Sequence, residues 1–333
     1  MSTFVIAEMS ANHNHQKQIA LDTIKAAKEA GADAVKIQTY TADTITLNCD
    51  NEHFQINQGT LWDGTTLYKL YQQAYTPWEW HQELFDYAKE LNIHLFSTPF
   101  DKTAVDFLEQ LNNPIMKIAS FELVDTPLIE YAASKGRPMI MSTGIATLEE
   151  IEDAVNACRR VGNNDITLLK CTSAYPAPLS EANLMTIPDM AKRFNCKVGL
   201  SDHTTGDTGA CTAVALGASV IEKHFIIDRS IGGPDSAFSM QKDEFSEMVR
   251  RIRETESCLG TVSYVLSEKM KKNRKFARSL FACKDIKKGE VFTEDNIRSV
   301  RPGDGCSPKF LPELLGKISD RDYKFGEPIV YNS

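Results

Sequence analysis

The stretch KVGLSDH, residues 197–203, leads an apolar run into three polar residues that can take part in chemistry. The same arrangement recurs along the first two-thirds of the chain. Continuous apolar runs of this length are typical of parallel strands, which are buried on both faces of their sheet. The eight runs are FVIAE (4–8), AVKIQT (34–39), IHLFST (93–98), IMKIAS (115–120), PMIMST (138–143), ITLLKCT (166–172), KVGLSDH (197–203) and VIEKHF (220–225).

Helical patterns lie between these runs. Residues 18–30 carry apolar side chains at helical spacing and end before Gly31, and Thr147 with Glu150 has the spelling of a capping box. Alternation of strands and helices with polar strand ends predicts a (β/α)8 TIM barrel whose active site lies at the carboxyl ends of the strands. We assign residues 1–262 to the barrel, 263–278 to a basic linker and 279–333 to a small second domain.

The composition excludes several classes of protein. The chain has 333 residues and no run of about 18 apolar residues, so we expect no membrane span. Its first residues lack the basic and apolar regions of a signal peptide, and eight scattered cysteines without a CxxC pair favour the cytosol. A net charge of −8 argues against a nucleic-acid partner. An anionic substrate would therefore need a local basic cluster.

One connection is much longer than the others. Residues 40–92 separate the second and third runs, and an insertion of this size usually carries function or forms a lid. Its aromatic side chains either stack on a sugar ring or pack the insertion onto the barrel, and packing is the favoured interpretation for any single one. They are Trp62, Tyr68, Tyr71, Tyr75, Trp78 and Trp80.

Two histidines follow the last two predicted strands. His203 and His224 lie 21 residues apart, which is one strand-to-strand step, so neighbouring strands would bring their imidazoles together. Two neutral imidazoles with open positions suit a divalent transition metal such as Mn, Fe, Co or Zn. Asp202 and Glu8 are expected nearby as partners of the ligands or of bound water.

Lysines and hydroxyls form a second group. Lys36 and Lys117 lie inside apolar runs, where a charge is costly unless it is paired. Hydroxyl groups cluster at the same level, at Thr98, Ser120, Ser142, Thr143 and Ser201. Together they predict a cradle for phosphate or carboxylate. The simpler alternative is that the lysines pair with Glu8 and Glu122.

Two other functions fit the same fold. Lys36, Lys117, Lys170 and Lys223 could each be the Schiff-base lysine of an aldolase, although that mechanism leaves the histidine pair without a role. A non-catalytic sugar-phosphate-binding protein is a further alternative, which polar residues at almost every strand end argue against. Chelator sensitivity would indicate metal chemistry, and borohydride trapping with substrate would indicate an imine.

Ten blocks of the sequence, in order, resemble the signature blocks of the sialic acid synthase family. The resemblance implies a (β/α)8 barrel followed by a small antifreeze-like (SAF) domain. It implies an enzyme that uses a divalent metal to condense phosphoenolpyruvate with the open-chain aldehyde of an amino sugar, releasing phosphate. It also implies a homodimer in which each small domain covers the partner's barrel mouth. The blocks are AEMSANHNH, VKIQTYTADT, FSTPFD, KIASFE, MSTG, CTSAYPAP, GLSDHT, EKHF, GGPDSAFSM and RPGDG.

The insertion resembles one branch of that family. Residues 38–47 (QTYTADTITL) and 61–81 (LWDGTTLYKLYQQAYTPWEWH) are similar to the branch that uses 2,4-diacetamido-2,4,6-trideoxy-L-altrose. An aromatic-rich lid offers apolar area to a sugar with a methyl group and two acetamido groups. The alternative is the amino sugar of the N-acetylneuraminate or legionaminate branch.

The resemblance also implies a role for individual residues. His203 and His224 would hold the metal, expected to be Mn²⁺, with Mg²⁺ or Co²⁺ as alternatives, and Glu8 would be the acid/base at the reacting carbons. Gln38, Glu122, Tyr175 and Asp235 would contact the sugar. Phosphoenolpyruvate would be bound by Lys36, Thr98, Lys117, Ser120, Ser142, Ser173, Ser201 and, from the partner subunit, Arg301. Ser173 stands where the neuraminate branch typically has asparagine, and a serine can still donate one hydrogen bond.

Overall fold

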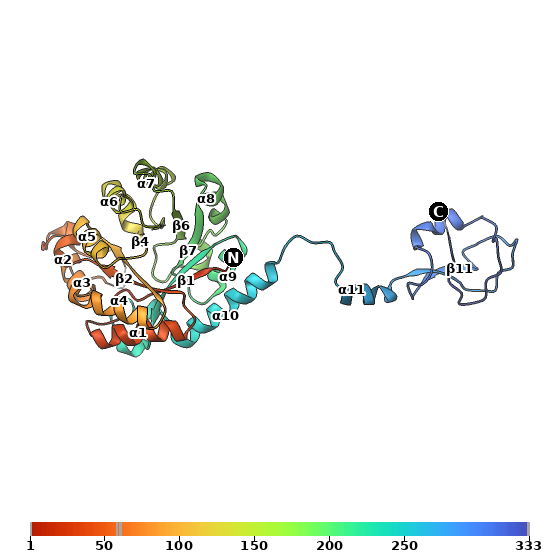
Figure 1. Ribbon diagram of the computed structural model, residues 1–333, viewed down its shortest axis with the longest axis horizontal. Helices are drawn as coiled ribbons and strands as arrows, with labels where there is room; N and C mark the ends of the chain where they lie inside the picture. The colour runs from red at the N-terminus through yellow and green to blue at the C-terminus, as the bar shows by residue number, and fades with distance from the viewer. Residues whose placement is uncertain (1, 58, 60–61, 332–333) are drawn as a thin grey trace. The chain divides into compact units, whose positions relative to one another are not determined.

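The first unit of the chain is a closed parallel barrel, as predicted. The computed structural model describes residues 2–57, 59 and 62–331, and the chain divides into two compact units, Met1–Gly260 and Thr261–Ser333. In the first unit each strand pairs in parallel with the next, and β1 also pairs with β8 (Figure 1). The strands are β1 (Phe4–Glu8), β2 (Ala34–Thr39), β3 (His94–Pro99), β4 (Met116–Ile118), β5 (Met139–Ser142), β6 (Ile166–Cys171), β7 (Lys197–Asp202) and β8 (Val220–Ile226), with a short β9 (Met240–Gln241) beside β8.

Helices connect the strands and form the outer layer of the barrel. The predicted capping box is present, since the Glu150 amide donates to Thr147 Oγ1 at 3.3 Å and the Thr147 amide donates to Glu150 Oε2 at 2.7 Å. No helix in the described part of the chain is both long and apolar enough to cross a lipid bilayer. The principal helices are α1 (Lys17–Glu29), α4 (His81–Glu90), α5 (Lys102–Gln110), α6 (Thr126–Ala133), α7 (Leu148–Arg160), α8 (Thr186–Phe194), α9 (Thr208–Ala215) and α10 (Lys242–Leu259).

The barrel interior consists of an apolar layer followed by a polar one. The apolar layer is one cluster made of Ile6, Ala34, Phe96, Ile140, Leu169 and Val220. Side chains of a strand alternate between its two faces, so the residue two positions later points inward again. In every one of these strands that residue is polar or a thiol: Glu8, Lys36, Thr98, Ser142, Cys171 and Glu222. The apolar layer therefore forms the floor of a polar site at the carboxyl ends of the strands.

The insertion packs mainly onto the barrel. It contains α2 (Ala42–Ile45), α3 (Leu67–Ala74) and the 3-10 turns η1 (Glu52–Phe54) and η2 (Trp78–Trp80). The Trp78 ring stacks on Phe107 at 4.8 Å. Tyr71 meets Tyr40 edge-on at 5.6 Å, and Tyr40 in turn meets Phe100, which follows β3, at 5.0 Å. The packing interpretation therefore holds for these two aromatic residues.

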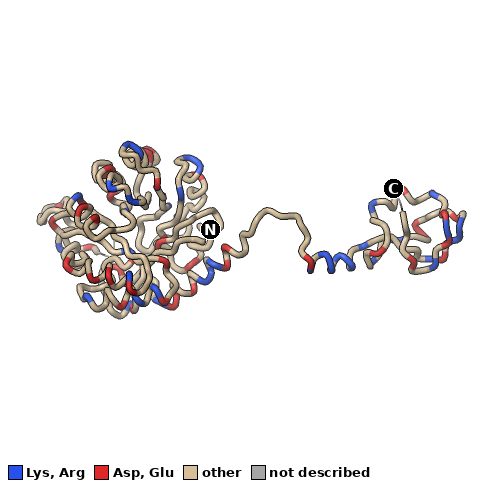
Figure 2. The backbone as a smooth tube through the Cα atoms, in the orientation of Figure 1, with Lys and Arg blue, Asp and Glu red and all other residues tan. Residues whose placement is uncertain are grey.

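The second unit has a core of its own. Strands β10 (Ser279–Ala282) and β11 (Ile297–Val300) pair antiparallel, and α12 (Leu311–Leu314) contributes Leu314 to the cluster. The segment predicted as a basic linker contains α11 (Glu268–Asn273), and Figure 2 marks Lys and Arg positions along its backbone in blue. The core of this unit is built from Leu280, Ala282, Ile286, Phe292, Ile297, Leu314, Tyr323 and Ile329.

Candidate active site

Two lysines and two glutamates form a buried ion-pair cluster inside the barrel. Lys36 Nζ lies 2.9 Å from Glu8 Oε2 and 3.4 Å from Glu222 Oε1, and it donates to Thr98 Oγ1 at 3.4 Å. Lys117 Nζ lies 3.8 Å from the same Glu222 oxygen. All four charged side chains are at least nine-tenths buried. Their formal charges cancel, so each lysine is held in the barrel by carboxylates.

Hydroxyl groups complete the surroundings of Lys117 and Glu222. Lys117 Nζ donates to Ser142 Oγ at 2.8 Å and to the Ile118 carbonyl at 3.1 Å. Ser201 Oγ donates to Glu222 Oε1 at 3.4 Å. The structure thus brings predicted cradle residues from β2, β3, β4, β5 and β7 to one place.

Burial and charge act in opposite directions on these groups. Burial raises the pKa of Glu8 above its ordinary value, although Lys36 opposes the shift. Burial would also raise the pKa of Glu222, but Lys117 and Lys36 outweigh it and lower that pKa. Burial lowers the pKa of Lys117, whereas for Lys36 the carboxylates of Glu222 and Glu8 overcome burial and raise its pKa. Of the two carboxylates, Glu8 is therefore the one that more readily takes up a proton.

A second group of hydroxyls lies beside the cluster. Ser173 Oγ donates to Ser120 Oγ at 3.0 Å, and the Cys171 thiol is 3.9 Å from Ser173 Oγ. Gly144 faces all three side chains: a Cβ atom there would lie 2.1 Å from Ser173 Oγ and 2.4 Å from Ser120 Oγ. A glycine is required here because the Cβ atom of any other residue would overlap the hydroxyl groups of Ser120 and Ser173.

The predicted histidine pair is formed at the ends of β7 and β8. The rings of His203 and His224 are 5.4 Å apart. His203 Nδ1 lies 2.9 Å from the Thr172 carbonyl, which orients the ring and leaves Nε2 free to bind a ligand. His224 Nδ1 is buried without a hydrogen-bond partner among the described residues, and burial holds its pKa well below the ordinary value.

These histidines fit a divalent metal as a pair of ligands. A neutral imidazole with an unpartnered buried nitrogen and a second imidazole with one free nitrogen are the donors that such ions prefer. Among the described residues, no group of three or more His, Cys, Asp or Glu side chains is placed to hold an ion. Any ion bound here would therefore keep positions open for substrate or water, as catalytic sites do.

Residues predicted to contact the sugar lie around this pair. The Tyr175 ring is 4.3 Å from His203, and Gln38 Nε2 donates to Glu8 Oε1 at 2.9 Å and to Ser10 Oγ at 3.0 Å. Asp235 is buried and its Oδ2 accepts from the Ala11 amide at 3.1 Å. Three predicted sugar contacts thus converge on the rim near β1, β7 and β8.

Glu122 lies apart from the lysines. It makes no ion pair with Lys36 or Lys117, and its Oε2 is buried without a hydrogen-bond partner among the described residues. Burial raises the pKa of Glu122 to about 7. In the alternative of lysine–glutamate pairing, Glu8 is a partner of Lys36 but Glu122 is not a partner of either lysine, because Glu222 occupies the central position between the two ammonium groups.

Asp202 also points elsewhere than expected. Its Oδ2 lies 2.7 Å from Lys223 Nζ and its Oδ1 accepts from the Thr204 amide and hydroxyl, so it does not assist the histidines. Lys223 donates further to the Thr204 and Gly206 carbonyls. Because side chains alternate along a strand, Asp202 and Lys223 each lie on the face opposite to that of the inward-facing residue beside them.

Two residues of the site were missed from the sequence. Glu222 lies two positions before His224 in VIEKHF, and alternation along the strand could have placed both inside the barrel. Cys171 lies 3.8 Å from His203 Nδ1, and only its position at a strand end could have indicated it. Of the predicted residues, Arg301 is exposed and belongs to the second unit, after β11.

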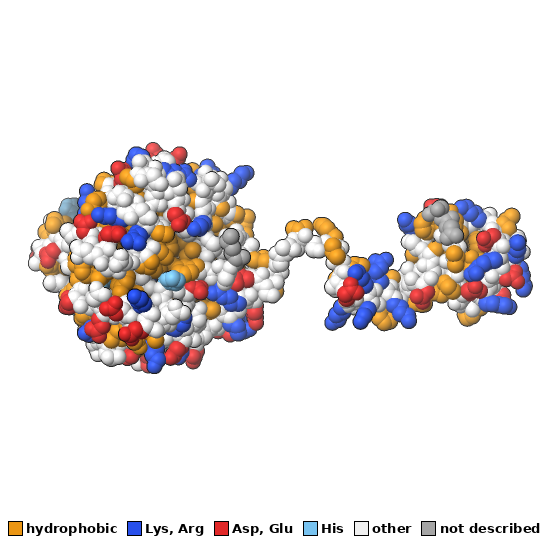
Figure 3. All heavy atoms as spheres, in the orientation of Figure 1, with side chains coloured by type: hydrophobic (Ala, Val, Ile, Leu, Met, Phe, Trp, Pro, Cys, Tyr) orange, Lys and Arg blue, Asp and Glu red, His pale blue; other side chains and the backbone are white. Residues whose placement is uncertain are grey.

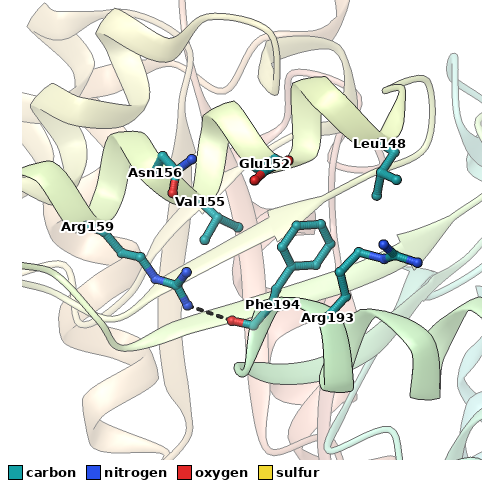
Figure 4. A pocket seen from close by; sticks show the side chains of 7 residues that line it. All are labelled: Leu148, Glu152, Val155, Asn156, Arg159, Arg193 and Phe194. Atoms are coloured by element: carbon teal, nitrogen blue, oxygen red, sulfur yellow. Dashed lines mark hydrogen bonds between the residues drawn. The ribbon is translucent and has the colours of Figure 1, made fainter.

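One cavity of the first unit lies between two helices of the outer layer and not at the predicted site. A cavity of about 180 Å³ lies between α7 and α8, where Arg159 donates to the Phe194 carbonyl at 2.6 Å (Figure 4). None of the predicted site residues lines it. On the visible face of the first unit, hydrophobic side chains gather near the middle, with charged side chains around them (Figure 3).

Comparison with known proteins identifies the family. The model of the NeuB family matches residues 23–264, and that of the SAF domain matches residues 277–333. The chain belongs to the NeuB family. The pseudaminic acid synthase of Campylobacter jejuni is 51% identical to this NeuB member over 98% of the chain and 95% of the relative. The N,N'-diacetyllegionaminic acid synthase of the same organism is 39% identical over 98% of each chain.

Solved structures of NeuB relatives have the same architecture. The N-acetylneuraminic acid synthetase of Leptospira borgpetersenii, crystallised with citrate, is 30% identical, with a TM-score of 0.72. The match covers 82% of this chain and 90% of that one. With the SAF match over residues 277–333, the barrel followed by a terminal SAF domain is the architecture of this NeuB member, as the sequence predicted.

Proposed function

We propose that this NeuB member is a pseudaminic acid synthase, which condenses phosphoenolpyruvate with 2,4-diacetamido-2,4,6-trideoxy-L-altrose. The proposal is carried by the buried lysine, glutamate and hydroxyl cluster lying next to the histidine pair, in a chain that is 51% identical to a pseudaminic acid synthase. Identity to a legionaminic acid synthase of the same organism is 39%, which favours the pseudaminic branch.

Phosphoenolpyruvate would bind between the ion-pair cluster and the hydroxyl cluster. Lys36 and Lys117 supply ammonium donors, and Thr98, Ser142 and Ser201 already contact members of the ion-pair cluster. Ser120 and Ser173 add hydroxyl donors beside Gly144. Because the charges of the cluster cancel, a substrate with both a phosphate and a carboxylate needs further positive charge in order to bind.

That charge would come from two sources. A divalent ion, with Mn²⁺ as the expected one, would be held by His203 and His224, and when bound it supplies a Lewis acid for the sugar aldehyde. Arg301 would supply a guanidinium from the partner subunit of a homodimer. The small domain that carries Arg301 would also cover the partner's barrel mouth and exclude bulk water from the reacting groups.

The reaction would join C3 of phosphoenolpyruvate to the aldehyde carbon, turn the aldehyde oxygen into an alkoxide and leave cationic character at C2. Water then adds at C2, and the tetrahedral intermediate expels phosphate by cleavage of the C–O bond. Glu8 lies between Lys36 and His224 in the register of β1, which supports a role in which its carboxylate would stabilise the cation, accept a proton from the water and pass it to the alkoxide. The raised pKa of Glu8 suits a group that takes up and releases a proton.

A substrate panel tests the proposed function. The purified chain is incubated with phosphoenolpyruvate, Mn²⁺ and one of three sugars: the diacetamido altrose, the legionaminic precursor or N-acetylmannosamine. Phosphate release only with the altrose is expected. Turnover only with N-acetylmannosamine would overturn the branch and retain the family.

A trapping experiment tests the aldolase alternative. Lys223 is engaged by Asp202 and two carbonyls, and Lys36 by two carboxylates. Lys117 donates to Ser142 and to a carbonyl, and Lys170 donates to the Cys171 carbonyl, so each of the four candidate amines is already engaged. Borohydride with the substrates is therefore expected to leave the protein mass unchanged. A covalent adduct on a lysine, together with activity that survives EDTA, would support the aldolase instead.

A further inference from the structure

A cavity of about 560 Å³ lies next to the site, between the β1–α1 loop, the insertion and the loop after β8. None of the residues given a role above lines it. We refer to it as the insertion pocket. The residues of its wall that matter here are Asn14, His15, Trp62, Gln72, Gln73 and Pro234.

The wall of the insertion pocket is held in place by contacts between distant segments. His13 Nε2 lies 3.2 Å from Thr76 Oγ1, and the His15 ring meets Tyr75 at 4.8 Å, so the β1–α1 loop is fixed to the insertion. Asn14 Nδ2 donates to the Ile231 carbonyl at 3.3 Å. Asn14 and His15 have φ angles of 46° and 52°, a left-handed conformation that costs energy outside glycine and clusters at functional sites.

The insertion pocket adjoins the end of the site where the sugar is predicted to bind. The Trp62 ring lies 5.7 Å from the Tyr175 ring, which in turn is 4.3 Å from His203. Trp62 Nε1 donates to the carbonyl of Pro234, the residue before Asp235, at 3.1 Å. A sugar with its aldehyde at the histidines and its chain along Tyr175 therefore extends toward Trp62 and the pocket.

The lining has the chemistry of a neutral amide site. Asn14, Gln72 and Gln73 offer both N–H donors and carbonyl acceptors, and Trp62 and Pro234 offer apolar surface. His15 Nε2 is buried and has no hydrogen-bond partner among the described residues. No lysine or arginine is found in the described wall, and Asp63 accepts from the Gly59 amide at 2.9 Å.

These observations disfavour an anion and favour an acetamido group. An acetamido group has one N–H donor and one carbonyl acceptor, which match the side-chain amides and the imidazole of the wall, and one methyl group, which matches the indole. A pocket of this kind combines apolar walls with a few polar groups that fix orientation.

We propose that the insertion pocket binds the acetamido group at the end of the sugar remote from the aldehyde, at C4, and thereby selects sugars with two acetamido groups. This inference rests on the proposed function. It assigns specificity within the family to His15 and Gln73, which lie outside the barrel strands.

The test compares two sugars in the full-length chain. They are the diacetamido altrose and its analogue with a hydroxyl in place of the C4 acetamido group. His15→Ala and Gln73→Ala are each expected to raise KM for the diacetamido sugar by up to about tenfold, the effect of losing one hydrogen bond, with kcat within about twofold. KM for phosphoenolpyruvate and kcat/KM for the hydroxyl analogue should not change. Gln82→Ala, an exposed amide on α4, is the matched control and should change nothing.

The outcomes separate this inference from the proposed function. If the unaltered chain turns over the diacetamido sugar but the variants keep its KM, the inference is wrong and the proposed function stands. If kcat/KM of the variants falls equally for both sugars, or if their KM for phosphoenolpyruvate rises, the substitutions disturb the fold and the inference is wrong. If the unaltered chain turns over neither sugar, the proposed function fails and this inference fails with it.

Discussion

Glu8 and Lys36 occupy paired positions on β1 and β2, and their charged atoms lie 2.9 Å apart inside the barrel. On its other side, β1 places Glu8 opposite His224 of β8. One carboxylate therefore connects the lysines that would bind phosphate with the histidines that would bind the metal. This arrangement is set by the register of the β1–β2 and β1–β8 pairs and does not depend on a flexible loop.

Glu8→Gln should lower kcat by about 10²–10⁴-fold, because the amide keeps the size of the side chain but cannot accept a proton. Steady-state phosphate release measures the effect, and circular dichroism checks the fold. Glu130→Gln, at an exposed ion pair with Arg160, is the control and should retain full activity. Near-normal turnover in Glu8→Gln would exclude the acid/base role.

Glu222→Ala should destabilise the protein by about 3–5 kcal/mol, because it removes a buried carboxylate shared by two ammonium groups. Urea unfolding gives the change in the free energy of unfolding. Glu130→Ala removes a surface carboxylate and should cost about 1 kcal/mol or less. Equal losses in the free energy of unfolding would show that the buried carboxylate of Glu222 stabilises the protein no more than a surface carboxylate does.

Gly144→Ala should abolish or greatly weaken the binding of phosphoenolpyruvate. The new methyl group would lie 2.1 Å from Ser173 Oγ, so the hydroxyl cluster must move apart. Separate KM values for the two substrates measure this, and the larger rise is expected for phosphoenolpyruvate. An unchanged value would mean that the hydroxyls of Ser120 and Ser173 do not contact it.

His203→Ala and His224→Ala should each remove metal binding and activity while the fold remains intact. Each variant takes one of two imidazole ligands from the ion. Titration with Mn²⁺, followed by electron paramagnetic resonance, reports binding without depending on turnover. Full activity of a preparation stripped with EDTA would exclude the metal.

Glu122 should make stability depend on pH. Burial raises its pKa from 4.5 to about 7, so the folded state keeps a proton that the unfolded chain has already released. Its contribution to stability is full below pH 4.5, falls as the pH rises to about 7, and is absent above that value. Melting temperatures between pH 4 and about 8 should fall less in Glu122→Gln than in the unaltered chain. Parallel curves would show that Glu122 is not the group responsible.

The barrel could be predicted from the sequence because its signal is repeated. Each buried strand is an apolar run with a polar end, and the inward positions two residues apart alternate from Ile6 to Glu8 and from Val220 to Glu222. The histidine pair followed from the spacing of neighbouring strands. Partners within the site were harder to predict, because the choice between Glu122 and Glu222 for the lysines depends on the direction of each side chain. Contacts of the insertion, such as Trp62 with Tyr175, depend on tertiary packing alone.

The pairing of β1 with β8 has a consequence for biosynthesis. The strand that carries Glu8 is made well before its partner, which begins at Val220. Until then the nascent chain has a half-built sheet with two unsatisfied edges, which are templates for wrong pairing. We therefore expect chains terminated before residue 220 to aggregate, and function to arise only after the last strand has closed the ring.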